Sequence, residues 1–124
     1  MTRRLIRIKA FNVLYQASLN TETTSSELQK NLKNEIINTS LLLVTVYQFL
    51  IQLCDYVLVF SNQRSSKHLP TQEDLNINTK LAYNIVIKAL KENQSIIDLT
   101  KKHKLYNDFD TEYIKKQFLD LQKT

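Results

Sequence analysis

The chain of 124 residues contains no glycine and a single proline. Glycine supplies the positive φ angles of tight hairpin turns and lets a backbone approach phosphate closely. Its absence excludes the Walker loop and the dinucleotide-binding fingerprint, and no segment alternates apolar and polar residues as a half-buried strand requires. The sequence therefore predicts an all-α fold, a compact bundle of about five to seven helices in a single helical domain over residues 1–124.

The first residues concentrate positive charge. Arg3, Arg4 and Arg7 fall within an arc of roughly 100° on a helix, and no acidic residue precedes Glu22. Cations are unfavourable at a helix N-terminus, whereas an anion such as phosphate would be stabilised there by the helix dipole and the guanidinium groups. A basic, solvated first turn explains the same pattern. These residues alone support an anion site and a solvated turn equally.

The opening helix is expected to begin at residue 2 or 3 and to end at residue 18 or 19. Its wet face would carry Lys9, Asn12 and Gln16, because these polar residues recur at helical spacing. The expected core-facing anchors of this helix are Ile8, Phe11 and Tyr15, and the buried sector would be widened by Ala10, Val13 and Leu14.

A second helix is expected after a polar connection. Thr24 and Glu27 have the spacing of a capping box, in which a hydroxyl and a carboxylate three residues later bind the free N–H groups of a helix start. The sequence leaves open whether this helix breaks near Asn34.

Residues 41–60 are apolar enough to raise the question of a membrane span. Thr45, Gln48, Gln52 and Asp55 nevertheless recur at helical spacing and draw one polar line along the segment. This pattern predicts the central helix of a soluble bundle, with a polar strip that reaches water and no membrane partner.

Residues 61–78 include the only proline and are expected to form the longest connection, pinned to the core by Leu69 and Leu75. Asn78 or Thr79 would cap the next helix, whose apolar rows contain Leu81, Ile85 and Ala89 in one line and Ala82, Val86 and Leu90 in the next.

The sequence predicts an interruption near Asn93, either a bend or the start of a fresh helix that ends near Lys104. Residues 101–104 are basic, as a helix C-terminus favours. Asp110 or Thr111 would cap a last helix. Its inward residues would be Ile114, Phe118 and Leu121.

Residues typical of catalysis are sparse. His68 and His103 lie far apart in the sequence, with no cysteine or carboxylate at metal-ligand spacing. Glu73 and Asp74 form a carboxylate pair in a polar segment, where solvated acids are the commoner case. We therefore expect no enzymatic activity, no cofactor and no metal. The lone Cys54 is expected to pack as a small apolar side chain in a reducing, cytoplasmic compartment.

Two motifs together carry a family resemblance. The first consists of Arg3, Arg4, Arg7 and Ala10 followed by Leu14, Tyr15 and Gln16. The second is the run LPTQEDLNxNT over residues 69–79. The first motif resembles the opening of the NusB family of transcription antitermination factors. The second resembles a segment of the longer NusB-like proteins, which carry an additional N-terminal helical region.

The resemblance implies an RNA-binding module that recognises the boxA element of nascent ribosomal RNA as a single strand. It also implies the ribosomal protein NusE and the transcription elongation complex as partners. Carried over by motif position, Arg3, Arg4 and Arg7 would contact RNA, with Lys9 as a fourth candidate. The net charge of +5 suits such a polyanionic partner. Tyr15 is as much a core residue as an RNA contact.

One departure concerns the family's C-terminal half, whose Phe-Val-Asn-Gly stretch cannot occur in a chain without glycine. The chain is therefore expected to be either the N-terminal portion of a longer protein or a diverged form. The alternative function is a helical protein–protein interaction domain that does not bind RNA.

Overall fold

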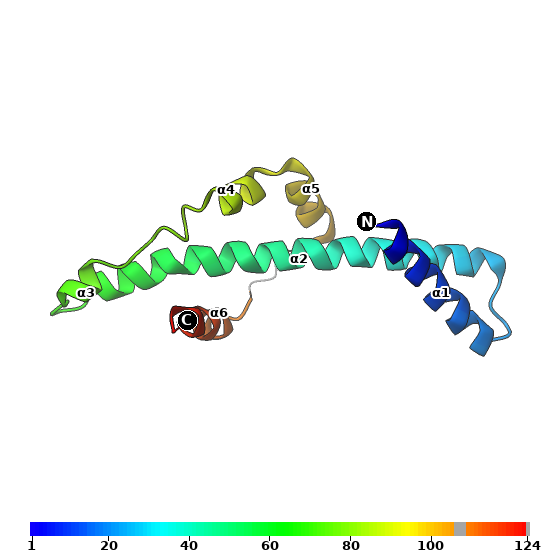
Figure 1. The fold of residues 1–124 in the computed structure, drawn as a ribbon, viewed down its shortest axis with the longest axis horizontal. Coiled ribbons are helices and arrows are strands. Elements are labelled where there is room, and N and C mark those ends of the chain that lie inside the picture. Colours follow the sequence, from blue (N-terminus) through cyan, green and yellow to red (C-terminus); the bar gives the residue numbers. More distant parts are fainter. Residues whose placement is uncertain (106–108, 124) are drawn as a thin grey trace. The chain divides into compact units, whose positions relative to one another are not determined.

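In a computed structural model of the protein, residues 1–105 and 109–123 are described, and they form six helices and no strand (Figure 1). The helices are α1 Arg3–Leu19, α2 Ser25–Ser65, α3 Gln72–Leu75, α4 Ile85–Glu92, α5 Gln94–His103 and α6 Thr111–Gln122. The predicted all-α fold and its number of helices are confirmed for this part of the chain. Contacts group the chain into two compact units, Met1–Leu43 and Val44–Thr124.

The first unit contains α1 and the first part of α2. The Thr2 hydroxyl accepts a hydrogen bond from the Leu5 N–H at 3.3 Å, so α1 begins where the sequence predicts. The predicted capping box is also confirmed, because the Thr24 N–H donates to Glu27 Oε2 at 2.9 Å and the Glu27 N–H donates to Thr24 Oγ1 at 3.3 Å. The Thr24 N–H, followed by the Thr24 hydroxyl, holds the pKa of the Glu27 carboxyl below its ordinary value.

The predicted anchors of α1 are wrong, although Val13 lies in the buried sector as expected. Val13 is the residue of α1 that is buried, at 5% exposed, whereas Ile8, Phe11 and Tyr15 are exposed. Phe11 and Tyr15 each lie two residues from Val13, which places them about 200° around the helix from it. Apolar residues surround this helix, so periodicity alone does not select a packing face.

A tertiary ion pair helps to select that face. Lys9 was expected to face water, but its Nζ lies 3.1 Å from Glu35 Oε2 on α2. Ala10 and Ala17, which are partly buried, flank Val13. The aromatic rings on the far side of α1 stack on each other instead.

Helix α2 is one helix of 41 residues and does not break near Asn34. No glycine or proline interrupts it. By length and composition α2 could cross a membrane, a test that the core helix of a soluble protein also passes, and 33% of its most apolar window is buried.

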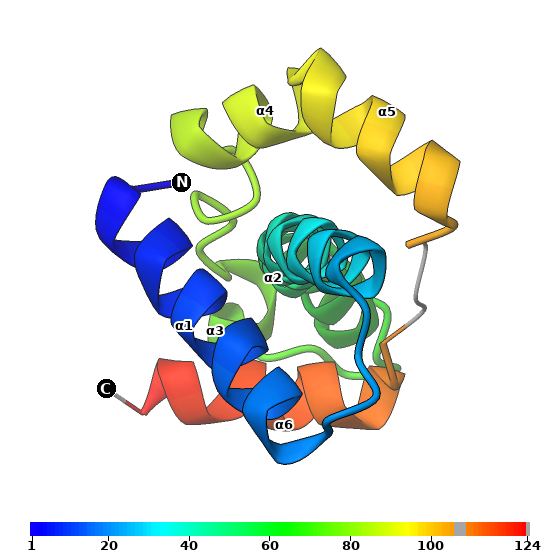
Figure 2. The ribbon, with the colours of Figure 1, turned by 90° about the vertical axis from the view of Figure 1, so that its right-hand side faces the viewer.

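In the second unit, α4 and α5 lie along one side of α2 and α6 runs across the opposite side (Figures 1 and 2). Two apolar clusters join α2 to α6 and to α4. One contains Leu53, Tyr56, Val57, Ile114 and Phe118, and the other contains Ile51, Cys54 and Ile87. The central position predicted for residues 41–60 is therefore confirmed for the part of α2 that carries these clusters.

The polar line along α2 meets partners on α4 and α5. Gln48 Nε2 donates to Thr100 Oγ1 at 3.1 Å, and Lys91 Nζ lies 2.6 Å from Asp55 Oδ1. The strip is therefore partly buried and hydrogen-bonded to neighbouring helices as well as reaching water. Paired polar groups of this kind avoid the cost of desolvation along a buried helix.

Residues 61–78 differ from the prediction. Helix α2 extends to Ser65, and the short α3 follows within this segment. Leu69 and Leu75 are 83% and 53% exposed, so they do not pin the segment to the core. The buried residue is Asp74, at 5% exposed, which hydrogen-bonds the Thr71 N–H and two cationic side chains. Polar contacts hold the segment where apolar ones were expected.

The start of α4 also differs. Asn84 caps α4 through a hydrogen bond from the Val86 N–H at 2.8 Å, and the Asn78 side chain accepts from the Lys80 N–H in a preceding turn. Ile87 is the buried residue of α4, whereas Ile85 is exposed. The predicted cap at Asn78 or Thr79 is therefore wrong, because the Asn78 side chain closes a separate turn and the helix is capped by Asn84.

The last two helices largely match the prediction. Asn93 caps a fresh helix, α5, which ends at His103, so the alternative of a simple bend is excluded. Asp110 caps α6, and Ile114 and Phe118 are buried as expected. The third expected inward residue of α6, Leu121, is exposed.

Candidate nucleic-acid interface

The three predicted arginine contacts share the exposed side of α1. Arg3, Arg4 and Arg7 are exposed and lie in its first two turns. Lys9 does not join them, because it lies about 140° around the helix from Arg4 and its ammonium group pairs with Glu35. Its side chain is 24% exposed. The structure thus brings three of the four predicted residues together and places the fourth between the helices.

The same exposed side carries two aromatic residues that the sequence interpretation assigned to the core. Phe11 is 67% exposed and Tyr15 is 57% exposed, with ring centroids 6.3 Å apart and ring planes 13° apart. Arg7, Phe11 and Tyr15 follow one another at four-residue spacing, so they form one row along the helix. Their spacing was visible in the sequence, but the orientation of the row toward solvent was not.

This side of α1 lacks acidic groups. The first turn of α1 has no acidic residue, and the first acid of the chain, Glu22, follows the end of the helix. Glu35 lies on the opposite side, where it neutralises Lys9. The row of Arg7, Phe11 and Tyr15, with Arg3 and Arg4, is called the arginine–aromatic face below. It offers guanidinium donors beside flat rings.

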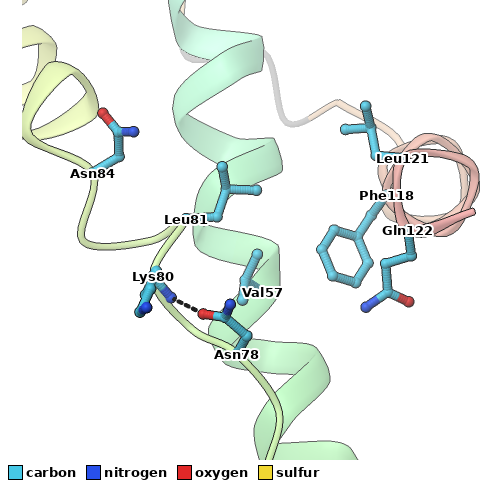
Figure 3. A pocket seen from close by; sticks show the side chains of 8 residues that line it. All are labelled: Val57, Asn78, Lys80, Leu81, Asn84, Phe118, Leu121 and Gln122. Atoms are coloured by element: carbon cyan, nitrogen blue, oxygen red, sulfur yellow. Dashed lines mark hydrogen bonds between the residues drawn. The ribbon is translucent and has the colours of Figure 1, made fainter. Parts of the chain in front are cut away.

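The second unit contains an open pocket between α2, residues 78–84 and α6, with a volume of about 420 Å³ (Figure 3). Val57, Phe118 and Leu121 supply apolar walls, and amide groups of Asn78 and Asn84 lie on the loop side. The one charged residue that lines it is Lys80. Among these lining side chains no nucleophile is paired with a base.

Metal-ligating and reactive groups are dispersed in the described residues. No three His, Cys, Asp or Glu side chains lie together at ion-binding distance within residues 1–105 and 109–123. Cys54 is buried, and burial, followed by the nearby Asp55 carboxylate, raises the pKa of its thiol. A thiol with a raised pKa is a poor nucleophile, in agreement with the predicted packing role.

Comparison of the chain with protein-family models, with curated proteins and with solved structures gives no match. The arginine–aromatic face is therefore interpreted from its own chemistry.

Proposed function

We propose that this chain is an RNA-binding module of the NusB type, which acts in transcription antitermination on boxA-type elements of nascent ribosomal RNA. The observation that supports this proposal most strongly is the arginine–aromatic face, where three exposed guanidinium groups lie beside an exposed stacked pair of rings. It functions without catalysis, in the cytoplasm. NusE and the elongation complex are the partners proposed with it.

The face suits single-stranded RNA on chemical grounds. Guanidinium groups bind phosphate oxygens with paired N–H donors, which positions the strand without reading its sequence. Unpaired bases stack on exposed aromatic rings, and each such stack contributes about 1–3 kcal/mol. In duplex RNA the bases are already stacked on one another, so flat exposed rings favour a single strand.

A second candidate function is docking of a helical protein partner. Leu14 and Leu19 of α1 are 61% and 73% exposed. Two large apolar side chains exposed on one helix are a feature of surfaces that bind another protein. A protein partner would cover these leucines and would bind with little dependence on salt.

Salt dependence of RNA binding tests the proposal. A single-stranded boxA-type RNA should bind with a log–log salt slope that becomes flatter by about 0.7 for each lost phosphate contact. The variant Arg3→Gln/Arg7→Gln should therefore flatten the slope by about 1.4. The control Lys30→Gln/Lys33→Gln removes the same charge from exposed positions of α2 in the same unit and should change the slope much less.

Equal slopes in both variants would refute a specific role for the arginine–aromatic face. Absence of RNA binding by the unmodified chain at low salt would refute the RNA module and favour protein docking. In that case Leu14→Ser/Leu19→Ser should abolish capture of a protein partner while Arg3→Gln/Arg7→Gln should not.

A further inference from the structure

A second basic site lies in the other unit, where the end of α2 faces α6. A pocket of about 260 Å³ is lined there by three cationic side chains: Arg64 in the last turn of α2, Lys67 just after that helix, and Lys115 from α6. Tyr56, Phe60 and Leu119 supply apolar wall, and the polar Gln63 also lines it. Cations from two helices therefore converge on one small concave surface.

A buried carboxylate orients two of these cations. Lys67 Nζ lies 3.0 Å and 3.1 Å from the two Asp74 oxygens, and Arg64 NH1 donates to Asp74 Oδ1 at 3.0 Å. Asp74 is also held by the Thr71 N–H in the capping box of α3. The Asp74 side chain is 6% exposed, whereas Arg64 and Lys67 are each 44% exposed. The acid thus lies beneath the cations that it positions.

Arg64 is held in a second way. Its guanidinium carbon lies 5.0 Å from the centroid of the Phe60 ring, and Phe60 in turn packs on Phe118. A guanidinium group has five N–H donors, and one of these is occupied by Asp74. No other hydrogen bond of the Arg64 side chain is formed within the described residues. Fixing the side chain in advance lowers the entropy that a ligand would have to remove.

The charge of the pocket is not balanced. Within the described residues, Asp74 is the carboxylate that pairs with Arg64 and Lys67, so three cations meet one paired carboxylate there. Lys115 forms no ion pair with any residue in the described part of the chain. A dianion between Lys115 and the Arg64–Lys67 pair would balance this excess of two positive charges, and a phosphodiester, with one negative charge, would balance half of it.

We propose that this pocket binds a phosphate group of an RNA strand, with Arg64 as the guanidinium donor and Lys67 and Lys115 as point charges. The identity of the ligand as RNA rests on the proposed function, whereas the affinity for phosphate rests on the pocket alone. Arg–phosphate pairing provides direction and the lysines provide charge. Lys116, one residue along α6 and outside the pocket, is not part of the site.

Inorganic phosphate tests the pocket independently of RNA. Titration of the isotope-labelled chain, at constant ionic strength maintained with chloride, should give saturable NMR shifts at the Arg64 side chain and at Lys115. Lys115→Gln should weaken this binding about fivefold, the effect of one unit charge at about 4 Å in water. The matched control Lys116→Gln should leave it within about twofold. NMR shifts that do not saturate, or equal losses of phosphate affinity in both variants, would refute the pocket as a phosphate-binding site.

Oligouridine binding then tests the identity of the ligand. Lys115→Gln should flatten the log–log salt slope by about 0.7 relative to Lys116→Gln, as expected for one lost phosphate contact with a single strand. RNA binding with equal slopes in the two variants would refute the pocket as an RNA contact and leave the RNA module supported. Phosphate binding that needs Lys115, without any RNA binding, would support the pocket and refute the RNA module.

Discussion

Truncation of the stacked rings on α1 separates a binding role from a core role. We expect Phe11→Ala/Tyr15→Ala to weaken binding of single-stranded RNA while the chain remains folded. Phe11 and Tyr15 are more than half exposed, so alanine leaves no cavity. The double variant should lose about 0.5–1.5 kcal/mol of unfolding free energy, the contribution of an aromatic pair. A buried Phe→Ala substitution would cost about 3–5 kcal/mol.

The expected loss of RNA affinity follows from stacking. One base stacked on a ring contributes about 1–3 kcal/mol, which corresponds to about 5- to 150-fold weaker binding when the ring is removed. The rings carry no charge, so the salt slope should stay unchanged even as affinity falls. This combination distinguishes loss of stacking from loss of a phosphate contact.

Fluorescence anisotropy with labelled oligouridine measures affinity and slope, and chemical denaturation measures stability. Leu42→Ala, which removes an exposed apolar side chain from α2 in the same unit, is the matched control and should alter neither. Unchanged RNA affinity in Phe11→Ala/Tyr15→Ala would refute the stacking role. A loss of unfolding free energy near the buried-Phe value would show that the rings belong to a core.

Two further predictions concern stability. The Lys67 ammonium group, then the Thr71 N–H and Arg64, hold the pKa of the Asp74 carboxyl well below its ordinary value, so its contribution to stability should be present above about pH 4 and lost as the pH falls toward the folded-state pKa. Asp74→Asn should lower the melting temperature at neutral pH and remove this acid-dependent component. A melting temperature of the unmodified chain that does not change from neutral to acid pH would contradict the prediction. Phe118→Ala should lower the unfolding free energy by about 3–5 kcal/mol because Phe118 is buried between α2 and α6, whereas Leu69→Ala should change it by less than about 0.5 kcal/mol. Urea denaturation measures both, and similar losses in the two variants would contradict the assignment of the core.

The limits of helices with local caps were readable from sequence. Thr24 and Glu27, Asn93 and Asp110 each lie within a few residues of the N–H groups that they bind, so their effect depends on short-range geometry alone. The same reasoning failed at Asn78, because an Asn side chain also closes isolated turns. A local signal shows that a turn or cap forms, and the flanking packing decides which of the two it is.

Side-chain contacts between elements could not be predicted from the sequence. Asp74 anchors residues 66–76 through Arg64 and Lys67, although its neighbours Leu69 and Leu75 looked like the natural anchors. Burial of a carboxylate is favourable only where cations meet it in space. No sequence pattern indicates that Arg64 and Lys67 both pair with Asp74.

What the sequence by itself determined is the all-helical fold and the grouping of Arg3, Arg4 and Arg7 on one side of a helix. The absence of glycine and the 3.6-residue period are properties of the chain that need no partner. What the tertiary structure decided is which side of α1 faces water. Apolar residues surround α1, so the Lys9–Glu35 ion pair and the burial of Val13 orient it and leave Phe11 and Tyr15 exposed beside the arginines.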